Sequence, residues 1–121
     1  MKVIIIDDDN LTLEMFREYL NQKEIQNILI SDPSTAFEII YQEKPDLIFI
    51  DIKMGPPTGR DIIEKMNFEA LDIPIVVMSA FLTHSMKKGL TTHLKIKHFL
   101  PKPFTLSDAD KFINLYSYIE C

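Results

Sequence analysis

Two short apolar runs that each end in carboxylates constrain this chain more than any other feature. Residues 3–6 are Val-Ile-Ile-Ile and are followed by Asp7 and Asp8, while residues 47–50 are Leu-Ile-Phe-Ile and are followed by Asp51. Short runs rich in β-branched residues, without polar alternation, predict strands of a parallel sheet that is buried on both faces. Ligands bind beyond the carboxyl ends of such strands. The sequence therefore predicts a carboxylate-rich site at one sheet edge.

Apolar runs alternate with amphipathic stretches five times along the chain. Strands are predicted near residues 2–6, 28–31, 46–50, 74–79 and 97–100. Helices are predicted over about 10–21, from Pro33 to the residues before Pro45, from Gly59, over about 84–94, and from Ser107. Asp9 or Asn10 is the predicted N-cap of the first helix. Asp32 and the pair Ser107 with Asp110 are the predicted caps of the second and fifth helices.

Five such units predict an α/β fold, a five-stranded parallel sheet with helices on both faces and right-handed crossovers. The flavodoxin-like strand order 2-1-3-4-5 would make the first and third strands neighbours where the order reverses. Asp7, Asp8 and Asp51 would then meet in the crevice at that point.

Length and composition indicate one domain, spanning residues 1–121. The chain is 46% hydrophobic and 26% charged, which is ordinary for a globular protein. No apolar run approaches the roughly 18 residues needed to cross a bilayer, and strand pattern begins at once, without room for a signal peptide. Because Cys121 is the single cysteine, no intrachain disulfide can form. We expect a cytoplasmic protein that does not bind membranes.

Charge is unevenly distributed along the chain. The net charge is −5, which argues against general nucleic-acid binding, yet residues 73–107 contain five lysines and no acidic residue, leaving −10 on the remainder. This basic segment indicates either docking of an acidic partner, or an isologous homodimer, or simply a solvated face. The histidines His84, His93 and His98 lie in the same segment without metal-ligand spacing, and we expect them to be surface residues.

Two later strand ends add groups suited to phosphate chemistry. The run at 75–78 ends in Ser79, and the run at 99–100 leads through Pro101 to Lys102. Carboxylates about 5 Å apart repel by roughly 3 kcal/mol per pair at an effective dielectric near 20, so the acidic cluster favours a bound cation. Mg²⁺ fits best, because it prefers oxygen ligands and binds one or two carboxylates together with phosphate oxygens.

Asp51 is the predicted nucleophile, since it would lie between the acidic pair and the side chains of Ser79 and Lys102. Its attack on a phosphoryl group would form an acyl phosphate. The cation, the ammonium and the hydroxyl would stabilise charge on the phosphoryl oxygens during transfer.

Over its whole length the chain resembles the receiver domain of two-component response regulators, of the stand-alone, single-domain type. Four segments carry the resemblance: IIIDDD at 4–9, PDLIFIDIKM at 45–54 with Gly59 beyond it, PIVVMSA at 74–80, and FLPKPF at 99–104.

The resemblance implies that Asp51 is the phospho-acceptor and takes its phosphoryl group from a sensor histidine kinase or a histidine phosphotransfer protein. It implies Mg²⁺ ligation by Asp8 and Asp51 directly, by Asp7 through water, and by the backbone carbonyl of Lys53. Such a domain catalyses only its own phosphorylation and dephosphorylation and is not an enzyme acting on other substrates.

The resemblance also assigns a switch. Ser79 matches the switch hydroxyl, Phe99 the aromatic that moves with it, and Lys102 the family's characteristic lysine. The Lys102–Pro103 bond would be a cis peptide. The face made by the fourth helix, fifth strand and fifth helix would change shape and bind a downstream protein partner.

The chain departs from the family pattern in several places, including a stretch from Ser79 to Lys102 that is one residue longer than usual and a Phe99 without the hydroxyl of the commoner tyrosine. Gly55 stands where a proline is usual, with Pro56 and Pro57 after it. Residues 93–96 lack the usual small Gly/Ala pair, and we expect an irregular end of the fourth helix there.

Lys53 and Phe81 suggest a further hypothesis, that they lie over the bound phosphoryl group and hinder water. The alternative is that Lys53 points to solvent.

Two other functions stay open. Residues 7–12 superficially resemble the Asp-x-Asp motif of haloacid-dehalogenase-type phosphatases, in which Asp7 would be the nucleophile and Asp9 the acid/base. The chain could also be a docking module that works without phosphorylation.

Overall fold

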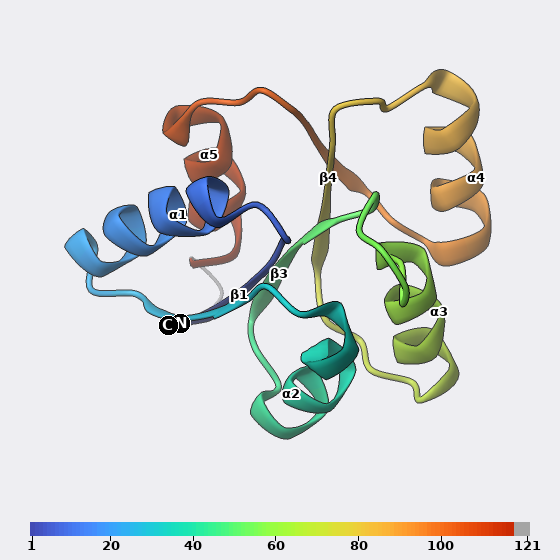
Figure 1. Cartoon of the computed structure of the whole chain (residues 1–121), viewed down its shortest axis with the longest axis horizontal. Coiled ribbons are helices and arrows are strands. Elements are labelled where there is room, and N and C mark those ends of the chain that lie inside the picture. Colours follow the sequence, from blue (N-terminus) through green and yellow to red (C-terminus); the bar gives the residue numbers. More distant parts are fainter. Residues whose placement is uncertain (118–121) are drawn as a thin grey trace.

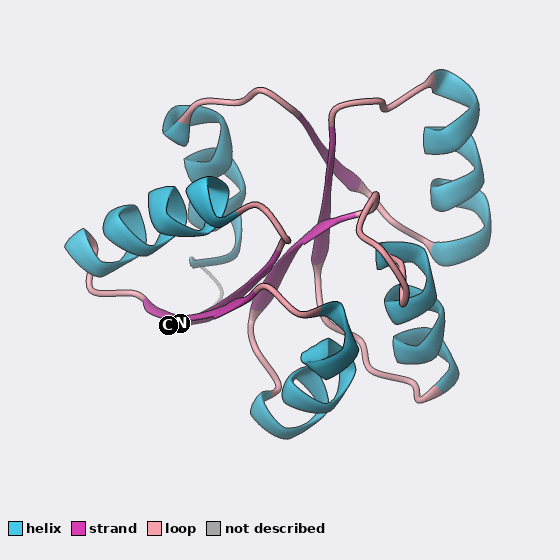
Figure 2. Ribbon diagram, in the orientation of Figure 1, coloured by secondary structure: helices cyan, strands magenta, loops and turns pink. Residues whose placement is uncertain are grey.

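The sheet has the predicted parallel order. A computed structural model describes residues 1–117 and shows five parallel strands in the order β2-β1-β3-β4-β5 (Figures 1 and 2). The strands are β1 (Lys2–Ile6), β2 (Gln26–Ile30), β3 (Leu47–Asp51), β4 (Ile75–Ser79) and β5 (His98–Pro101). The predicted fold class is therefore confirmed, and β1 and β3 are neighbours at the switch point.

Five α-helices and one short 3₁₀ turn connect the strands. They are α1 (Asn10–Gln22), the 3₁₀ turn Pro33–Thr35, α2 (Ala36–Glu43), α3 (Gly59–Phe68), α4 (His84–Leu94) and α5 (Leu106–Ser117). Figure 1 shows α1 and α5 on one side of the sheet and α2, α3 and α4 on the other. No helix within residues 1–117 has the length and apolar character required to span a bilayer.

Alternate residues of the strands fill two cores, one on each face. Ile4 and Ile48 face α2, α3 and α4, whereas Val3 and Phe49 face α1 and α5. All four side chains are fully buried, which explains why the strands lack polar alternation. Because both faces are covered, the strand ends are what the sheet presents to ligands.

The cap of α5 differs from the prediction. Thr105 and Asp108 form the reciprocal capping pair: the Asp108 N–H donates to Thr105 Oγ1 at 3.2 Å and the Thr105 N–H donates to Asp108 Oδ2 at 3.0 Å. Ser107 and Asp110 have the same spacing, but Asp110 turns toward α1, where it accepts a hydrogen bond from Tyr19 and pairs with Lys23. The tertiary contact to α1 decides between two equivalent local signals.

The end of α4 is irregular, as expected from residues 93–96. Lys95 lies in the left-handed region with φ of 59°, where glycine is favoured, and its N–H donates to the carbonyl of Leu90. Only Leu90 and Leu94 of this helix are buried. Gly89, Thr91 and Thr92 lie within this helix and have low helix propensity, so the local sequence specifies α4 weakly.

Candidate functional site

Asp7 and Asp51 lie side by side at the carboxyl edge of the sheet. Asp7 directly follows β1 and Asp51 is the last residue of β3, and the strands pair in register up to Ile6 and Ile50. Asp7 is fully buried, and Asp51 is 8% exposed. The sheet therefore holds two carboxyl groups in a largely dry position, which requires a compensating charge.

Lys102 supplies that charge. Its Nζ donates to Asp7 Oδ2 at 2.7 Å and to Asp51 Oδ2 at 3.1 Å. Burial alone would lower the pKa of Lys102, but its hydrogen bonds to the two carboxylates outweigh this and raise the pKa above its ordinary value. Lys102 is therefore protonated at neutral pH and bridges the ends of β1 and β3.

At Asp7, burial outweighs the hydrogen bonds in setting the pKa. Burial raises the pKa of Asp7 above its ordinary value, and the hydrogen bonds from Lys102 and from the Asp9 N–H offset this only in part. The ionised form of Asp7 thus still costs free energy despite Lys102, and a divalent ion nearby would relieve that cost.

The acidic cluster can hold such an ion. One carboxylate oxygen from each of Asp7, Asp8 and Asp51 lies within 4.8 Å of the others, and Asp8 is exposed and so reachable from solvent. An all-oxygen set of this kind suits Mg²⁺, which keeps several waters and binds few carboxylates. The Lys53 N–H donates to Asp51 Oδ1 at 2.9 Å, which places the Lys53 backbone beside the cluster. Ligation by its carbonyl stays a prediction.

Ser79 stands at the end of β4, next to Asp51 on β3. It is fully buried, its Oγ accepts the Phe81 N–H at 3.0 Å, and its carbonyl accepts the Lys102 N–H at 2.9 Å. A hydroxyl has one donor as well as acceptor positions, so Oγ can accept from Phe81 and still donate to another oxygen. The hydrogen bond between the Lys102 N–H and the Ser79 carbonyl ties the backbone of Lys102 to the end of β4.

The loop that carries Lys102 is held by an aromatic cluster. The Lys102–Pro103 peptide bond is cis. The Phe104 ring follows it and lies 5.8 Å from the ring of Phe16, which is itself buried and 5.0 Å from Phe49. Packing on the α1 face therefore positions the ammonium group at the sheet edge.

Gly59 presses against the backbone of Asp51. A Cβ at this position would lie 2.6 Å from the Asp51 carbonyl oxygen and 2.8 Å from the Ile52 Cα. Thr58 and Asp61 cap α3 reciprocally at the same place. This cap was not predicted, although the Thr-x-x-Asp spacing of Thr58 and Asp61 is a typical signal for the start of a helix. The preceding loop contains a second cis bond, Pro56–Pro57, where the chain departs from the family pattern.

Asp9 does not join the acidic cluster. It caps α1, accepting the Leu11 N–H at 3.0 Å and the Thr12 hydroxyl at 3.0 Å. The hydrogen bond from Thr12, and then that from Leu11, lower the pKa of Asp9 below its ordinary value. A carboxyl group of this kind is poorly suited to be the acid/base of a phosphatase.

Lys53 and Phe81 lie together at the rim of the site. The Lys53 Nζ is 5.9 Å from the centroid of the Phe81 ring, and the ring is 69% exposed. Phe99, the predicted switch aromatic, is half-buried on β5 against the α2–α3–α4 core, with Lys87 Nζ 5.9 Å from its ring centroid.

One histidine is placed differently from the expectation. His84 and His93 are exposed, but His98 is half-buried on β5, where its Nε2 shares a hydrogen bond with the Tyr116 hydroxyl and its ring centroid lies 5.3 Å from that of Phe112. Burial, and then the charge of Lys97, lower the pKa of His98 below its ordinary value. The expectation failed because the aromatic side chains of α5 cover this position.

Comparison with known proteins agrees with this geometry. A family model described as the response regulator receiver domain matches residues 3–114. The chain belongs to this family. It is 24% identical over 120 residues to the sporulation initiation phosphotransferase F of Bacillus subtilis, covering 95% of this chain and 92% of that protein. It is 28% identical over 109 residues to the response regulator MprA of Mycobacterium leprae, covering 89% of this chain but 47% of that protein, about half its length.

Solved receiver domains share the fold. A two-component response regulator from Clostridium difficile superposes with a TM-score of 0.86 at 24% identity, covering 98% of this chain and 96% of that one. The receiver domain of Ssk1 from Saccharomyces cerevisiae, in co-crystals with the histidine phosphotransfer protein Ypd1, gives a TM-score of 0.86 at 20% identity, covering 99% and 90%. At these identities the likeness concerns the fold.

The raised pKa of Asp7 predicts a pH effect on this receiver domain in EDTA. Because the folded state holds the Asp7 proton more tightly than the unfolded chain, stability falls as pH rises above the ordinary value of 3.8. Asp7→Asn removes this loss. We expect the free energy of unfolding of the variant, minus that of the wild type, to grow with pH from about 4 upward. Urea unfolding at several pH values measures it, and a flat or falling difference contradicts it.

The contact at Gly59 predicts a second outcome. Gly59→Ala forces the Asp51 backbone to shift and should lower the free energy of unfolding by about 1–3 kcal/mol, the usual cost of overpacking. Gly89→Ala is the matched control, because its Cβ meets nothing within 4 Å and lies inside α4. It should raise stability by about 0.5–1 kcal/mol. Equal effects in chemical denaturation would show that Gly59 has no special contact.

Proposed function

We propose that this receiver domain accepts a phosphoryl group on Asp51 and uses the modified state as a switch. The observation that carries the proposal is the Lys102 ammonium between Asp7 and Asp51, beside a cluster able to hold a divalent ion. Ser79 completes the set with a buried hydroxyl next to Asp51. These are the groups that phosphoryl transfer to a carboxylate needs.

The transfer is an in-line displacement. A carboxylate oxygen of Asp51 forms a bond to phosphorus, the P–N bond of a phosphohistidine donor breaks, and the bonding electron pair returns to the donor's imidazole. The product is an acyl phosphate on Asp51. The domain promotes this reaction, and the later hydrolysis, only on itself, so we do not expect turnover of another substrate.

Side chains of this domain would stabilise the negative charge of the phosphoryl group during the transfer. Lys102 turns from bridging two carboxylates to neutralising a phosphoryl oxygen, and Ser79 donates its hydroxyl hydrogen to another one. Asp7, Asp8 and Asp51, with the Lys53 carbonyl, would hold Mg²⁺. When bound, the ion neutralises negative charge on the phosphoryl oxygens.

A hollow next to Lys102 fits a docking donor. It has a volume of about 360 Å³ and lies between α1 and the loop after β5, lined by Asp9, Thr12, Met15, Ala80, Lys102, Pro103 and Phe104. Leu11, on the same helix, is 81% exposed. A sensor histidine kinase or a histidine phosphotransfer protein could place its histidine beside Asp51 from this side. The cytoplasm, where such donors present their phosphohistidine, is the proposed location.

The α4–β5–α5 face is the proposed output. Once Ser79 bonds the phosphoryl group, the half-buried Phe99 can move inward, and α4 can follow because its local sequence favours a helix only weakly. A downstream protein with an acidic surface, or a second copy of the chain, would bind the lysines of this face. We do not propose binding to nucleic acid.

The other two readings make different predictions. A phosphatase would be modified at Asp7, but Asp7 is fully buried and bonded to Lys102, and Asp9 caps a helix. A docking module that works without phosphorylation would take up no phosphate at all.

Peptide mapping by mass spectrometry after treatment with Mg²⁺ and acetyl phosphate tests the proposal. We expect phosphate on Asp51 and none in Asp51→Asn, because an amide cannot serve as the nucleophile. Asp72→Asn is the control, since this exposed carboxylate lies on the segment before β4 and should leave uptake unchanged. Modification of Asp7, or no Mg²⁺-dependent uptake in the wild type, overturns it.

Lys53 should lengthen the life of the phosphorylated form. Its ammonium lies near Phe81 at the rim, where the two side chains can obstruct water on the side opposite the leaving oxygen. Lys53→Asn should therefore accelerate phosphate loss severalfold, as measured by the decay of labelled protein. Lys88→Asn, an exposed lysine on α4, is the control. An unchanged decay in Lys53→Asn means that Lys53 points to solvent.

A further inference from the structure

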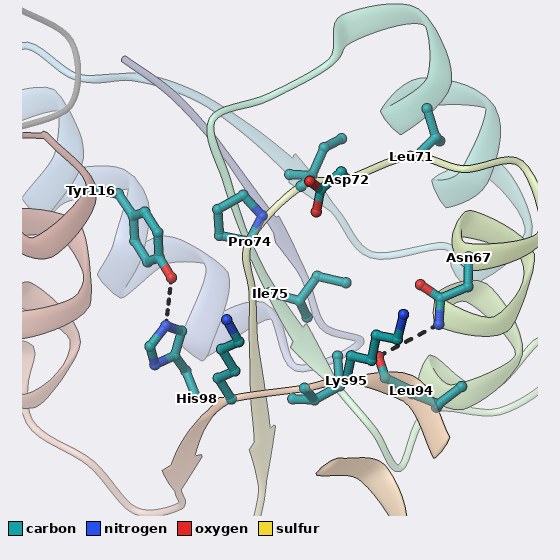
Figure 3. Close-up of a pocket in the computed structure, with 12 residues that line it drawn as sticks. Asn67, Leu71, Asp72, Pro74, Ile75, Leu94, Lys95, His98 and Tyr116 are labelled. Carbon is teal, nitrogen blue, oxygen red and sulfur yellow. Dashed lines mark hydrogen bonds between the residues drawn. The ribbon is translucent and has the colours of Figure 1, made fainter. Parts of the chain in front are cut away.

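A second hollow lies at the opposite edge of the sheet from Asp51. It has a volume of about 350 Å³ and is bounded by the end of α3, the segments that enter β4 and β5, the end of α4, and α5 (Figure 3). Its size falls within the range of small-molecule pockets in proteins. None of the phosphorylation groups lines it, so it is separate from the proposed site.

The walls combine apolar surface with a few polar groups. Half of the lining residues are apolar: Leu71, Ile73, Pro74, Ile75, Leu94 and Ile96. The others are Asn67, Asp72, Lys95, Lys97, His98 and Tyr116. Such a mixture is typical of a pocket that binds an apolar body and orients one polar group.

One end of the hollow is polar but uncharged at neutral pH. His98 and Tyr116 share a hydrogen bond, shown in Figure 3. Burial and Lys97 lower the pKa of His98, and burial raises the pKa of Tyr116, so both groups stay neutral. The pair therefore presents hydrogen-bonding capacity without charge.

Among the described residues that line the hollow, the side chains carry a net positive charge. Lys95 and Lys97 form no salt bridge with any residue in the described part of the chain, and Asp72 is the one acidic side chain within residues 1–117 that lines the hollow. At the end of α4, the Leu90 carbonyl accepts the N–H groups of Lys95 and Ile96, and the Leu94 carbonyl accepts a hydrogen bond from Asn67 Nδ2 at 3.5 Å. Lys95 and Lys97 thus both line the hollow without an acidic salt-bridge partner among the described residues.

We infer that this hollow is a binding site for a small organic carboxylate with an apolar body. The body would lie against Pro74, Ile75 and Leu94, and the carboxylate would face Lys95 and Lys97. Because both lysines are exposed to solvent, the affinity should be modest and should fall as the salt concentration rises.

The test is a titration followed by two-dimensional amide NMR on the full, unphosphorylated chain. Hydrocinnamate is the probe, and hydrocinnamyl alcohol and phenylpropylamine supply the same body with neutral and positive ends. We expect saturable shifts at Ile75, Leu94 and His98 with hydrocinnamate, weaker shifts with the alcohol, and the weakest with the amine. Because no phosphate is used, the result does not depend on the function of Asp51.

Paired variants test the charge. Lys97→Gln should weaken hydrocinnamate binding about fivefold, the upper range for one solvent-exposed charge pair. Lys88→Gln, an exposed lysine of α4 outside the hollow, should leave it unchanged. Shifts that do not saturate, an amine that binds as tightly as the acid, or equal affinities in the two variants would overturn the inference.

Discussion

The ammonium of Lys102 between Asp7 and Asp51 is the interaction on which the arrangement of the site depends. Two carboxyl groups at adjacent strand ends, one of them fully buried, would be strongly unfavourable without a cation. Lys102 provides a cation that belongs to the protein. In the proposed function, the same ammonium would neutralise the phosphoryl group after transfer. The loop after β5 is accordingly held from both sides, by the backbone of Ser79 and by the packing of Phe104 on Phe16.

The edge that carries Asp51 is more firmly specified by packing than α4 is by its sequence. Gly59 allows α3 to begin directly against the Asp51 backbone, and the fully buried strands leave little freedom at their ends. In contrast, α4 contains Gly89, Thr91 and Thr92, whose helix propensity is low. The proposed switch would need a fixed acceptor and an adjustable α4, because a small change at one place must be expressed as a larger one elsewhere.

Sequence reasoning succeeded where the signal was local and repeated. The strands were recognisable because burial on both faces requires unbroken apolar runs. The bounds of α4, His84–Leu94, and its irregular end were also predicted from the sequence. It failed where two local signals were equivalent or where a distant segment decided burial. Thr105 rather than Ser107 caps α5, since Asp110 is engaged by α1. His98 is half-buried because α5 covers it, which no spacing within residues 84–98 could reveal.

The sequence by itself determined the elements, their parallel arrangement and the residue types at each strand end, because these follow from periodicity, propensity and the chirality of crossovers. Only the tertiary structure decided which groups meet: that Lys102 bridges Asp7 and Asp51, and that Gly59 touches the Asp51 backbone. The hollow between α3, β4, α4 and β5 is likewise a product of packing. The physical reason is that the hydrophobic pattern of a strand is visible in consecutive residues of the sequence. Hydrogen bonds and cavities between elements depend instead on the distances between segments that are far apart in the sequence, and the order of residues does not fix those distances.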